Sequence, residues 1–334
     1  MNSLESPLTQ TDPFVHDEAD CFNFTEAVMG DADDHAAGLQ HWQQEYEQLS
    51  EGHFAGFVDE VWFGNVQIFR ERTNRVLHQT GLPWDGSCTI GVTLDATGDG
   101  LFSGTVLSRG SLVKLDQGEA LDFRTPRQLD IIAVATGAAQ LREFAFAVWG
   151  IDTKDKPVAS GVLKHSAEAA LGLSEFLEQL LRSIKSSPRM LNSPQVRKLI
   201  EEDIFNHLVI ATNDTIPGNQ PVVALSRKGV VDKTKAYLLE HHDDPVTVPD
   251  LCKALNISRR TLQYSFESVL DINPVAYLRA IRLNRARRTL KAGAEQMTVA
   301  DVAARWGFWH LSRFAGNYKQ MFGELPSETL RKHC

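Results

Sequence analysis

The chain has 334 residues, of which 43% are hydrophobic and 23% charged, and its formal net charge is −9. This length suffices for two domains of ordinary size, and the composition is that of a folded globular protein. No run of 18 or more apolar residues occurs, so we expect no membrane span. The N-terminus lacks a basic segment and an apolar core, and the four cysteines are far apart without a metal or disulfide pattern. We therefore expect a cytoplasmic protein.

The start of the chain is acidic and weakly patterned. It includes the cluster DADD at 31–34, and we expect residues 1–37 to be mostly flexible. A first domain is predicted over residues 38–212. The pattern HWQQEYEQLS from His41 predicts that this domain begins with a short helix that ends before Gly52.

Short runs with β character follow, separated by turn signals. Two turns, Asp95–Gly100 and Asp116–Gly118, are expected to be hairpin turns because they are rich in Asp and Gly. The pattern predicts a small antiparallel β sandwich or barrel-like domain, whose mouth is the kind of place where a small ligand binds. The expected strands are Gly56–Trp62, Asn65–Arg72, Ser87–Leu94, Leu121–Phe123 and Leu129–Ala135.

Two helices are predicted after the strands, at Ser166–Ser183 and Ser193–Thr212. Each has an apolar stripe wider than packing on one sheet requires. Such helices can pair across a two-fold axis in a homodimer, and they can equally form core within one chain. Residues 213–229 contain two prolines and are predicted to be an interdomain linker.

The last third of the chain, residues 230–334, contains one pattern twice. Both copies open with Thr-Val-x-Asp, at Thr247 and at Thr298, which is the form of a helix capping box. A turn is expected at Asn256 in the first copy and at Gly307 in the second, where a left-handed backbone costs least. A second helix then follows, so the sequence predicts helix-turn-helix motifs over 251–270 and 299–322.

The second helix of each copy is predicted to present polar side chains to the major groove of DNA. Leu262 and Phe266 should face inward in the first copy, and Phe314 and Tyr318 in the second. A lone basic helix is more often a solvated face, but two copies in register favour DNA reading. The candidate DNA-binding residues are Ser258, Arg259, Arg260, Gln263, Tyr264, Arg282, Trp309, His310, Ser312, Arg313 and Asn317.

Charge is distributed unevenly. Residues 226–334 carry 18 Lys and Arg against 11 Asp and Glu, a net +7, whereas residues 1–225 carry 16 against 32, a net −16. A basic third on an acidic chain is typical of phosphate binding. The helix expected at Pro274–Lys291 contains five arginines, some predicted to bind phosphates and others to pair with acids inside the domain.

These motifs resemble the DNA-binding domain of the AraC/XylS family of bacterial transcription regulators. The resemblance implies an α+β chain: an effector and dimerisation domain with flanking helices, then an all-α domain with two helix-turn-helix motifs. It also implies promoter DNA and RNA polymerase as partners, and an activator of a catabolic operon that responds to a small molecule. The matching residues are Leu251, Ser258, Leu262, Phe266, Pro274, Tyr277, Leu278, Arg282, Leu283, Ala286, Val302, Ala303, Gly307, Phe308, Ser312, Phe314, Phe322, Gly323, Pro326 and Ser327.

The stretch HWQQEYEQLSEGHFAGFVDEVWFGNVQIFRER resembles regulators of ethanolamine-utilisation operons. That resemblance implies ethanolamine with adenosylcobalamin as effector; related regulators respond to aromatic acids such as anthranilate, or to amines and amino acids. An acidic or aromatic pocket would suit an ammonium ligand, and paired arginines would suit a carboxylate. Apart from this resemblance no cofactor is expected. Asp59 and Glu60 could contribute to an acidic or aromatic pocket, and Arg75 to a pair of arginines. The candidate effector residues are Trp62, Gln67, Phe69, Arg70, Arg72 and Trp84.

Two other classes of protein fit the sequence less well. An enzyme is disfavoured because the chain has no GxSxG, HExxH, Walker A or GxGxxG motif. The run at His241–Asp244 precedes Pro245, and a solvated turn is the better interpretation than a metal site. An architectural DNA-binding protein without an effector would not need a folded N-terminal domain of this size.

Overall fold

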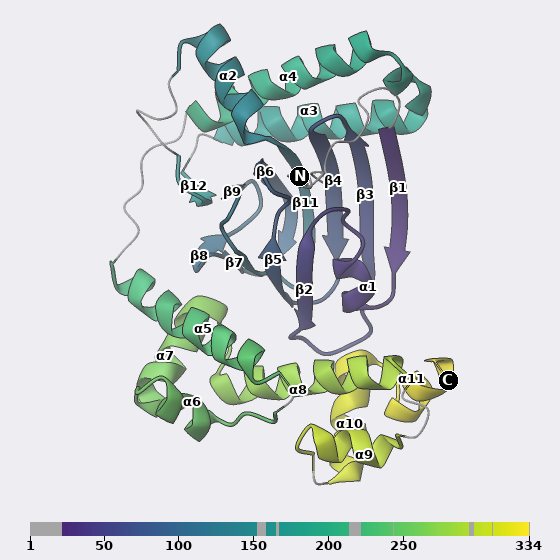
Figure 1. Cartoon of the computed structure of the whole chain (residues 1–334), viewed down its shortest axis with the longest axis vertical. Coiled ribbons are helices and arrows are strands. Elements are labelled where there is room, and N and C mark those ends of the chain that lie inside the picture. The colour runs from purple at the N-terminus through teal and green to yellow at the C-terminus, as the bar shows by residue number, and fades with distance from the viewer. Residues whose placement is uncertain are drawn as a thin grey trace, which may run out of the picture.

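The computed structural model describes residues 22–151, 158–164, 167–213, 222–242, 244–293, 297–308 and 310–333. A β-rich N-terminal half lies against a helical C-terminal half (Figure 1). Within the described residues, no helix is both long and apolar enough to cross a membrane. The architecture is α+β, as the sequence predicts.

The N-terminal half is an antiparallel sandwich of two sheets. A seven-stranded sheet has the order β1-β3-β4-β11-β6-β9-β12, and a five-stranded sheet has the order β2-β5-β10-β7-β8. Apolar side chains between the sheets, such as Phe102, Val113, Phe123 and Ile131, form one core cluster. The strands are β1 (Phe22–Met29), β2 (Gln43–Gln48), β3 (Gly56–Phe63), β4 (Val66–Thr73), β5 (Leu77–Leu82), β6 (Ser87–Thr97), β7 (Gly100–Phe102), β8 (Thr105–Leu107), β9 (Leu112–Asp116), β10 (Leu121–Arg124), β11 (Gln128–Gly137) and β12 (Gly161–Leu163).

Helices cover the outer face of the larger sheet. Leu177 and Leu208, from two of these helices, are fully buried against the even-numbered residues of β4 and β11 such as Ile68 and Ile132. Burying one such side chain contributes about 1.5–3 kcal/mol, so this layer stabilises the domain substantially. The helices are α2 (Ala138–Trp149), α3 (Ala167–Ser186), the short η1 (Pro188–Asn192) and α4 (Pro194–Asn213).

Several expectations for the N-terminal half are wrong. Within the stretch expected to be flexible, residues Phe22–Met29 form β1 and Ala32–Ala36 form α1, with Asp31 as its N-cap. The expected helix from His41 is instead strand β2, because pairing with β5 overrides local helical character. The two expected hairpin turns instead join strands of different sheets. The first connects β6 to β7 and the second connects β9 to β10; β6 and β9 belong to the larger sheet, whereas β7 and β10 belong to the smaller one.

The C-terminal half consists of helices arranged along α8, which runs under the smaller sheet of the N-terminal half (Figure 1). Helix α5 begins at Val222, so the last part of the expected linker is helical, while residues 214–221 lie outside the described part. The helices are α5 (Val222–Glu240), α6 (Val248–Ala254), α7 (Arg259–Leu270), α8 (Pro274–Lys291), α9 (Val299–Arg305), α10 (Leu311–Phe322) and α11 (Pro326–His333).

Candidate DNA-binding surface

The first helix-turn-helix is formed by α6 and α7. The Thr247 side chain accepts from the backbone N–H of Asp250, and the Asp250 side chain accepts from the backbone N–H of Thr247. The turn has Asn256 at φ 51°, a left-handed conformation that Asn tolerates. Ser258 caps α7 by accepting from the backbone N–H of Thr261 at 3.0 Å. The expected capping box and turn are confirmed.

The second helix-turn-helix is formed by α9 and α10 and repeats this geometry. Thr298 and Asp301 make the same reciprocal capping box. Gly307 has φ 75° in the turn. His310 is the N-cap of α10, but its side chain makes no capping hydrogen bond. Trp309, a candidate base contact, lies outside the described residues.

The inward faces hold both motifs against α8. Leu262 and Phe266 are fully buried in one cluster with residues of α8, and Phe314 and Tyr318 are buried in a second cluster on the other half of α8. The prediction of these four inward positions is confirmed. Since α8 contributes to both cores, it fixes the spacing between the two motifs.

The outward face of α7 is polar and accessible. Arg259, Arg260, Gln263 and Tyr264 are all exposed and line one shallow groove. The Arg260 guanidinium donates to the Tyr264 hydroxyl at 3.2 Å, and its central carbon lies 5.3 Å from the centre of the Tyr264 ring. This contact orients the guanidinium without neutralising it, so its charge stays available to an anion.

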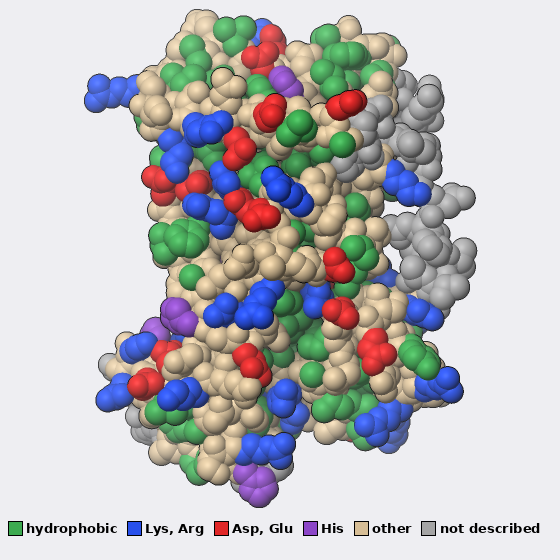
Figure 2. Space-filling view, turned by 180° about the vertical axis from the view of Figure 1, so that it is seen from behind, with side chains coloured by type: hydrophobic (Ala, Val, Ile, Leu, Met, Phe, Trp, Pro, Cys, Tyr) green, Lys and Arg blue, Asp and Glu red, His purple; other side chains and the backbone are tan. Residues whose placement is uncertain are grey.

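On α10, Ser312 and Arg313 are exposed, and Asn317 is half-buried one turn later. Among the described residues, no Asp or Glu forms a salt bridge with Arg259, Arg260 or Arg313. Lys and Arg side chains are spread over the surface of the helical half at the bottom of the molecule, and others lie on the upper half (Figure 2). The structure thus leaves cationic side chains accessible on both second helices.

Arg282 lies between the two motifs. Its Nε donates to the backbone oxygen of Leu278 at 3.3 Å, and its guanidinium lies 5.5 Å from the centre of the Phe308 ring in the second turn. It also lines a groove with Arg259 at the edge of α6. Burial, with Arg279 nearby, lowers the pKa of Arg282, which fits a cation held without a carboxylate partner.

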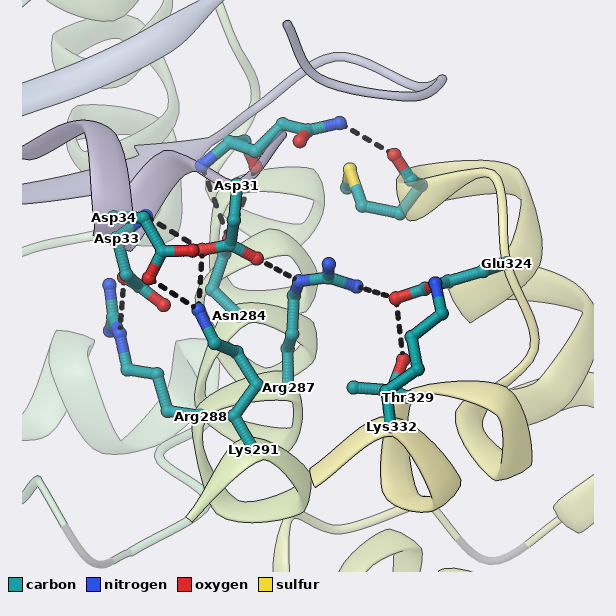
Figure 3. Close-up of polar contacts among 12 residues, drawn as sticks. Asp31, Asp33, Asp34, Asn284, Arg287, Arg288, Lys291, Glu324, Thr329 and Lys332 are labelled. Carbon is teal, nitrogen blue, oxygen red and sulfur yellow. Dashed lines mark hydrogen bonds and ion pairs between the residues drawn. The ribbon is translucent and has the colours of Figure 1, made fainter. Parts of the chain in front are cut away.

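The opposite face of α8 has the reverse character (Figure 3). Arg287 Nε lies 2.5 Å from Asp31 Oδ2, and Arg288 Nε lies 2.9 Å from Asp33 Oδ1. Lys291 Nζ lies 2.9 Å from Asp34 Oδ1. Arg288 also reaches two carboxylates of β2, Glu45 at 2.9 Å and Glu47 at 2.8 Å.

Backbone and amide groups extend this contact between the two halves. Asn284 of α8 accepts from the backbone N–H of Gln48 at 3.2 Å and donates to its oxygen at 3.1 Å. The Gln48 side chain donates to the Met321 oxygen at the end of α10 at 2.5 Å. The backbone N–H of Gly52 donates to the oxygen of Gln320 at 2.9 Å. The second motif is therefore fixed to the sandwich.

A buried polar cluster fixes the other end of α8. His78 Nε2 lies 3.1 Å from Asp122 Oδ1, and His78 Nδ1 lies 3.1 Å from the Tyr277 hydroxyl. Lys235 Nζ donates to the same Asp122 oxygen at 2.5 Å. Burial, reinforced by Lys235, lowers the pKa of His78 to about 4. A neutral His78 then donates from Nε2 to the carboxylate and accepts from Tyr277.

The candidate effector residues divide into two groups. Trp62, Gln67 and Phe69 lie on the face of the larger sheet that is turned toward the smaller sheet, and Trp84, in the connection between β5 and β6, donates its indole N–H to Gln67. Arg70 is on the other face, where it binds Asp130 and Glu178, and so is Arg72, which lies 3.7 Å from Asp59. The structure therefore does not bring the arginines to the other four residues. Sequence reasoning missed Trp42, whose indole N–H donates to Gln67 at 2.9 Å.

Comparison with known proteins agrees with these motifs. A family model described as a helix-turn-helix domain matches residues 251–332. The probable thc operon regulatory protein of Rhodococcus erythropolis is 29% identical over 227 residues, which are 67% of this chain and 68% of that protein. The XylDLEGF operon transcriptional activator 2 of Pseudomonas putida is 31% identical over 134 residues, which are 37% of this chain and 82% of the activator.

A solved structure, that of a probable AraC family transcriptional regulator from Rhodopseudomonas palustris CGA009, is 33% identical. The match covers 31% of this chain and 97% of that chain, with a TM-score of 0.29. The Pseudomonas activator is more than 30% identical to this chain over most of its own length, and this shows the family. The chain has two capped helix-turn-helix motifs on a shared central helix and shares this sequence similarity. It therefore belongs to the AraC/XylS family of DNA-binding transcription regulators.

Proposed function

We propose that the chain is an effector-responsive activator of a catabolic operon. The main support is the contrast between two surfaces. The second helix of each motif presents arginines that have no salt-bridge partner among the described residues, whereas the opposite face of α8 is attached to a separate folded domain. The names of the relatives support the kind of target, since they refer to the thc and XylDLEGF operons. A ligand-binding N-terminal domain would then act on DNA binding or on contact with RNA polymerase in the cytoplasm.

The two motifs would read adjacent major-groove segments, roughly one helical turn or about 10 bp apart. Arg259, Arg260 and Gln263 are the proposed contacts of the first motif, because Arg pairs with guanine and Gln with adenine through two hydrogen bonds each. His310, Arg313 and Asn317 are the proposed contacts of the second, with Arg282 placed to bind a phosphate between them. Ser258 and Ser312, at the start of α7 and α10, would add phosphate contacts, and Tyr264 and Trp309 apolar ones.

The salt dependence of DNA binding tests this proposal. The full chain is titrated with duplex DNA from upstream of its own gene and of neighbouring operons, at several salt concentrations. Each phosphate contact contributes about 0.9 to the slope of log affinity against log salt. Arg282→Ala, which removes the proposed phosphate contact, should therefore lower the slope by about 0.9, while Arg279→Ala on the exposed side of α8 is the matched control. An unchanged slope in Arg282→Ala would refute the assignment of a phosphate contact to this residue.

The effector itself is proposed only as a class. Ethanolamine with adenosylcobalamin stays a hypothesis, and so do an aromatic acid such as anthranilate and an amine or amino acid. A thermal-shift screen of the full chain against these compounds separates them, because a ligand that binds the folded state raises the melting temperature in proportion to its saturation.

We also propose a homodimer formed through α2, α3 and α4. These helices expose large apolar side chains that the sandwich does not cover, namely Phe146, Leu171, Leu199 and Ile210. Exposed apolar side chains on neighbouring helices can mark an interaction site. Light scattering should give the mass of a dimer, and the double variant Leu171→Glu with Leu199→Glu should give that of a monomer with an unchanged circular dichroism spectrum. A monomeric wild-type protein would contradict this.

A further inference from the structure

One row of side chains crosses the inner face of the larger sheet. The register pairs Trp62 with Gln67, Gln67 with Ala135, and Ala135 with Thr89. Because alternate residues of a strand share a face, Glu60 of β3 lies on the same face one pair away. Polar groups and small side chains therefore occupy a layer that is apolar elsewhere in the sandwich, which calls for an explanation.

Three tryptophans surround the centre of this row. The indole N–H groups of Trp42 and Trp84 both donate to Gln67 Oε1, at 2.9 and 3.2 Å. The rings of Trp62 and Trp84 have centroids 5.5 Å apart with a tilt of 59°. All three tryptophans are half-buried, so they form the rim of the cluster, while Gln67 is fully buried at its base.

A buried carboxylate completes the cluster. Gln67 Nε2 donates to Glu60 Oε1 at 2.5 Å, and the backbone N–H of Gln40 donates to the same oxygen at 3.2 Å. Glu60 is 2% exposed, and its other oxygen, Oε2, is buried and has no hydrogen-bond partner in the part of the chain that the structure describes. Among the described residues, no Lys, Arg or His forms a salt bridge with Glu60. Burial raises the pKa of Glu60, as expected for a carboxyl group that lacks a cation.

From this geometry we infer that the cluster of Trp42, Trp62, Trp84, Gln67 and Glu60 binds a small organic cation, a primary to quaternary ammonium. Aromatic faces attract such cations, and a carboxylate supplies the counter-charge. A carboxylate ligand is disfavoured, since Arg70 is held by Asp130 through two hydrogen bonds of 2.8 and 2.7 Å on the opposite face. The unpartnered hydroxyl of Thr89 on the same row offers the ligand one further hydrogen bond.

The cluster is also connected to the face of α8 that binds the sandwich. Gln40, which contacts both Glu60 and Gln67, lies in the connection between α1 and β2. The two flanking elements carry the carboxylates that hold α8: Asp33 on one side and Glu47 on the other pair with Arg288. A cation that changes the position of Gln40 would thereby act on the helix that sets the spacing of the two motifs. This inference rests on the proposed effector-responsive function and names the chemistry of its ligand.

Isothermal titration of the full chain tests the site. The probes are tetramethylammonium and propylammonium chloride, with propionate and propanol as the anionic and neutral analogues. Saturable binding of at least one ammonium ion, and of neither analogue, is expected. Propionate binding, or no saturable ammonium binding up to about 10 mM, would overturn the inference, since weaker binding is not specific recognition.

Variants locate the binding and separate this inference from the proposed function. Glu60→Gln keeps the contacts to Gln67 and Gln40 and should weaken ammonium binding at least tenfold, while Glu178→Gln, a carboxyl group bound to Arg70, should leave it unchanged. Equal affinity in Glu60→Gln would overturn the inference even if the variant were less stable. DNA binding without ligand is measured in parallel: if Glu60→Gln binds DNA as the wild type does, the regulator assignment stands whatever the titration shows.

Discussion

The arginines of α7 and those at the end of α8 have opposite surroundings. Arg259 and Arg260 are exposed and pair with no carboxylate among the described residues, whereas Arg287 and Arg288 are surrounded by acids of α1, β2 and the segment before α11. A net charge of +7 over residues 226–334 therefore overstates the cationic surface offered to DNA. Part of the basic charge holds the two halves of the molecule together, and the acidic N-terminal half supplies its partners.

The largest expected effect is on the attached face. Arg288→Ala leaves Asp33 and Glu47 without their partner in a partly buried site. Removing one member of a buried pair costs about 3–5 kcal/mol, and we expect the lower end, about 3 kcal/mol, because the Arg288 side chain is 28% exposed. Urea unfolding of the full chain measures it, with Arg279→Ala as the control. A loss below about 0.5 kcal/mol, as for a surface pair, would contradict this picture.

Acidification should also weaken the contact between the sandwich and α8, because it protonates His78 at the other end of this helix. Its folded pKa of about 4 lies below its ordinary value of 6.5, so the stabilisation is present above pH 6.5 and is lost as the pH falls toward 4. At about 1.4 kcal/mol for each unit, the full loss is about 3.5 kcal/mol, of which about 2 kcal/mol is lost above pH 5. Unfolding free energies at pH 7 and pH 5 are compared for wild type and His78→Gln. Identical pH dependence in the two proteins would exclude His78 as its source.

The accessible face should respond in DNA binding rather than stability. Arg260→Ala removes the guanidinium that Tyr264 orients, and losing a two-bond contact to guanine costs about 1–3 kcal/mol of binding free energy. Its unfolding free energy should stay within about 0.5 kcal/mol of wild type, because the side chain is exposed. Fluorescence anisotropy with a labelled duplex measures the first quantity. If Arg260→Ala unfolded more easily than wild type but bound DNA equally well, the assignment of Arg260 to DNA binding would be contradicted.

The smallest effect distinguishes the two motifs. Ser258 caps α7 through its side chain, whereas His310 at the equivalent position of α10 does not. Ser258→Ala should cost about 1 kcal/mol of stability, and His310→Ala should cost no capping energy. Thermal melts of both variants decide this; equal losses would contradict the difference between the two caps.

Local signals in the sequence predicted the helix-turn-helix motifs well. These signals depend on residues only three or four positions away. Thr247 and Thr298 each start a capping box, and Gly307 forms a left-handed turn. The sandwich and its α3–α4 cover were also predictable from hydrophobic pattern. The segment from Gln43 to Gln48 was not, because its strand depends on pairing with β5 about 35 residues later.

The functional site was predictable in part for the same reason. The outward positions of α7 follow from helical period, and the structure confirms that they are exposed; whether they contact DNA stays a prediction. The partners of Arg288 lie more than 240 residues away in the sequence, so no local pattern identifies them. Trp62 and Gln67 lie on one face of the larger sheet and Arg70 on the other. This arrangement depends on strand register, which a single sequence does not specify closely.

Selection of binding sites from random duplex DNA by the full chain tests the central claim most directly. Wild type should select two short conserved segments about one helical turn apart, and Arg260→Ala should lose base preference in one of them. Arg288→Ala should keep both segments and change only the tolerated spacing between them. If Arg260→Ala selected the wild-type sequence while Arg288→Ala lost base preference, the assignment of the two faces would be contradicted.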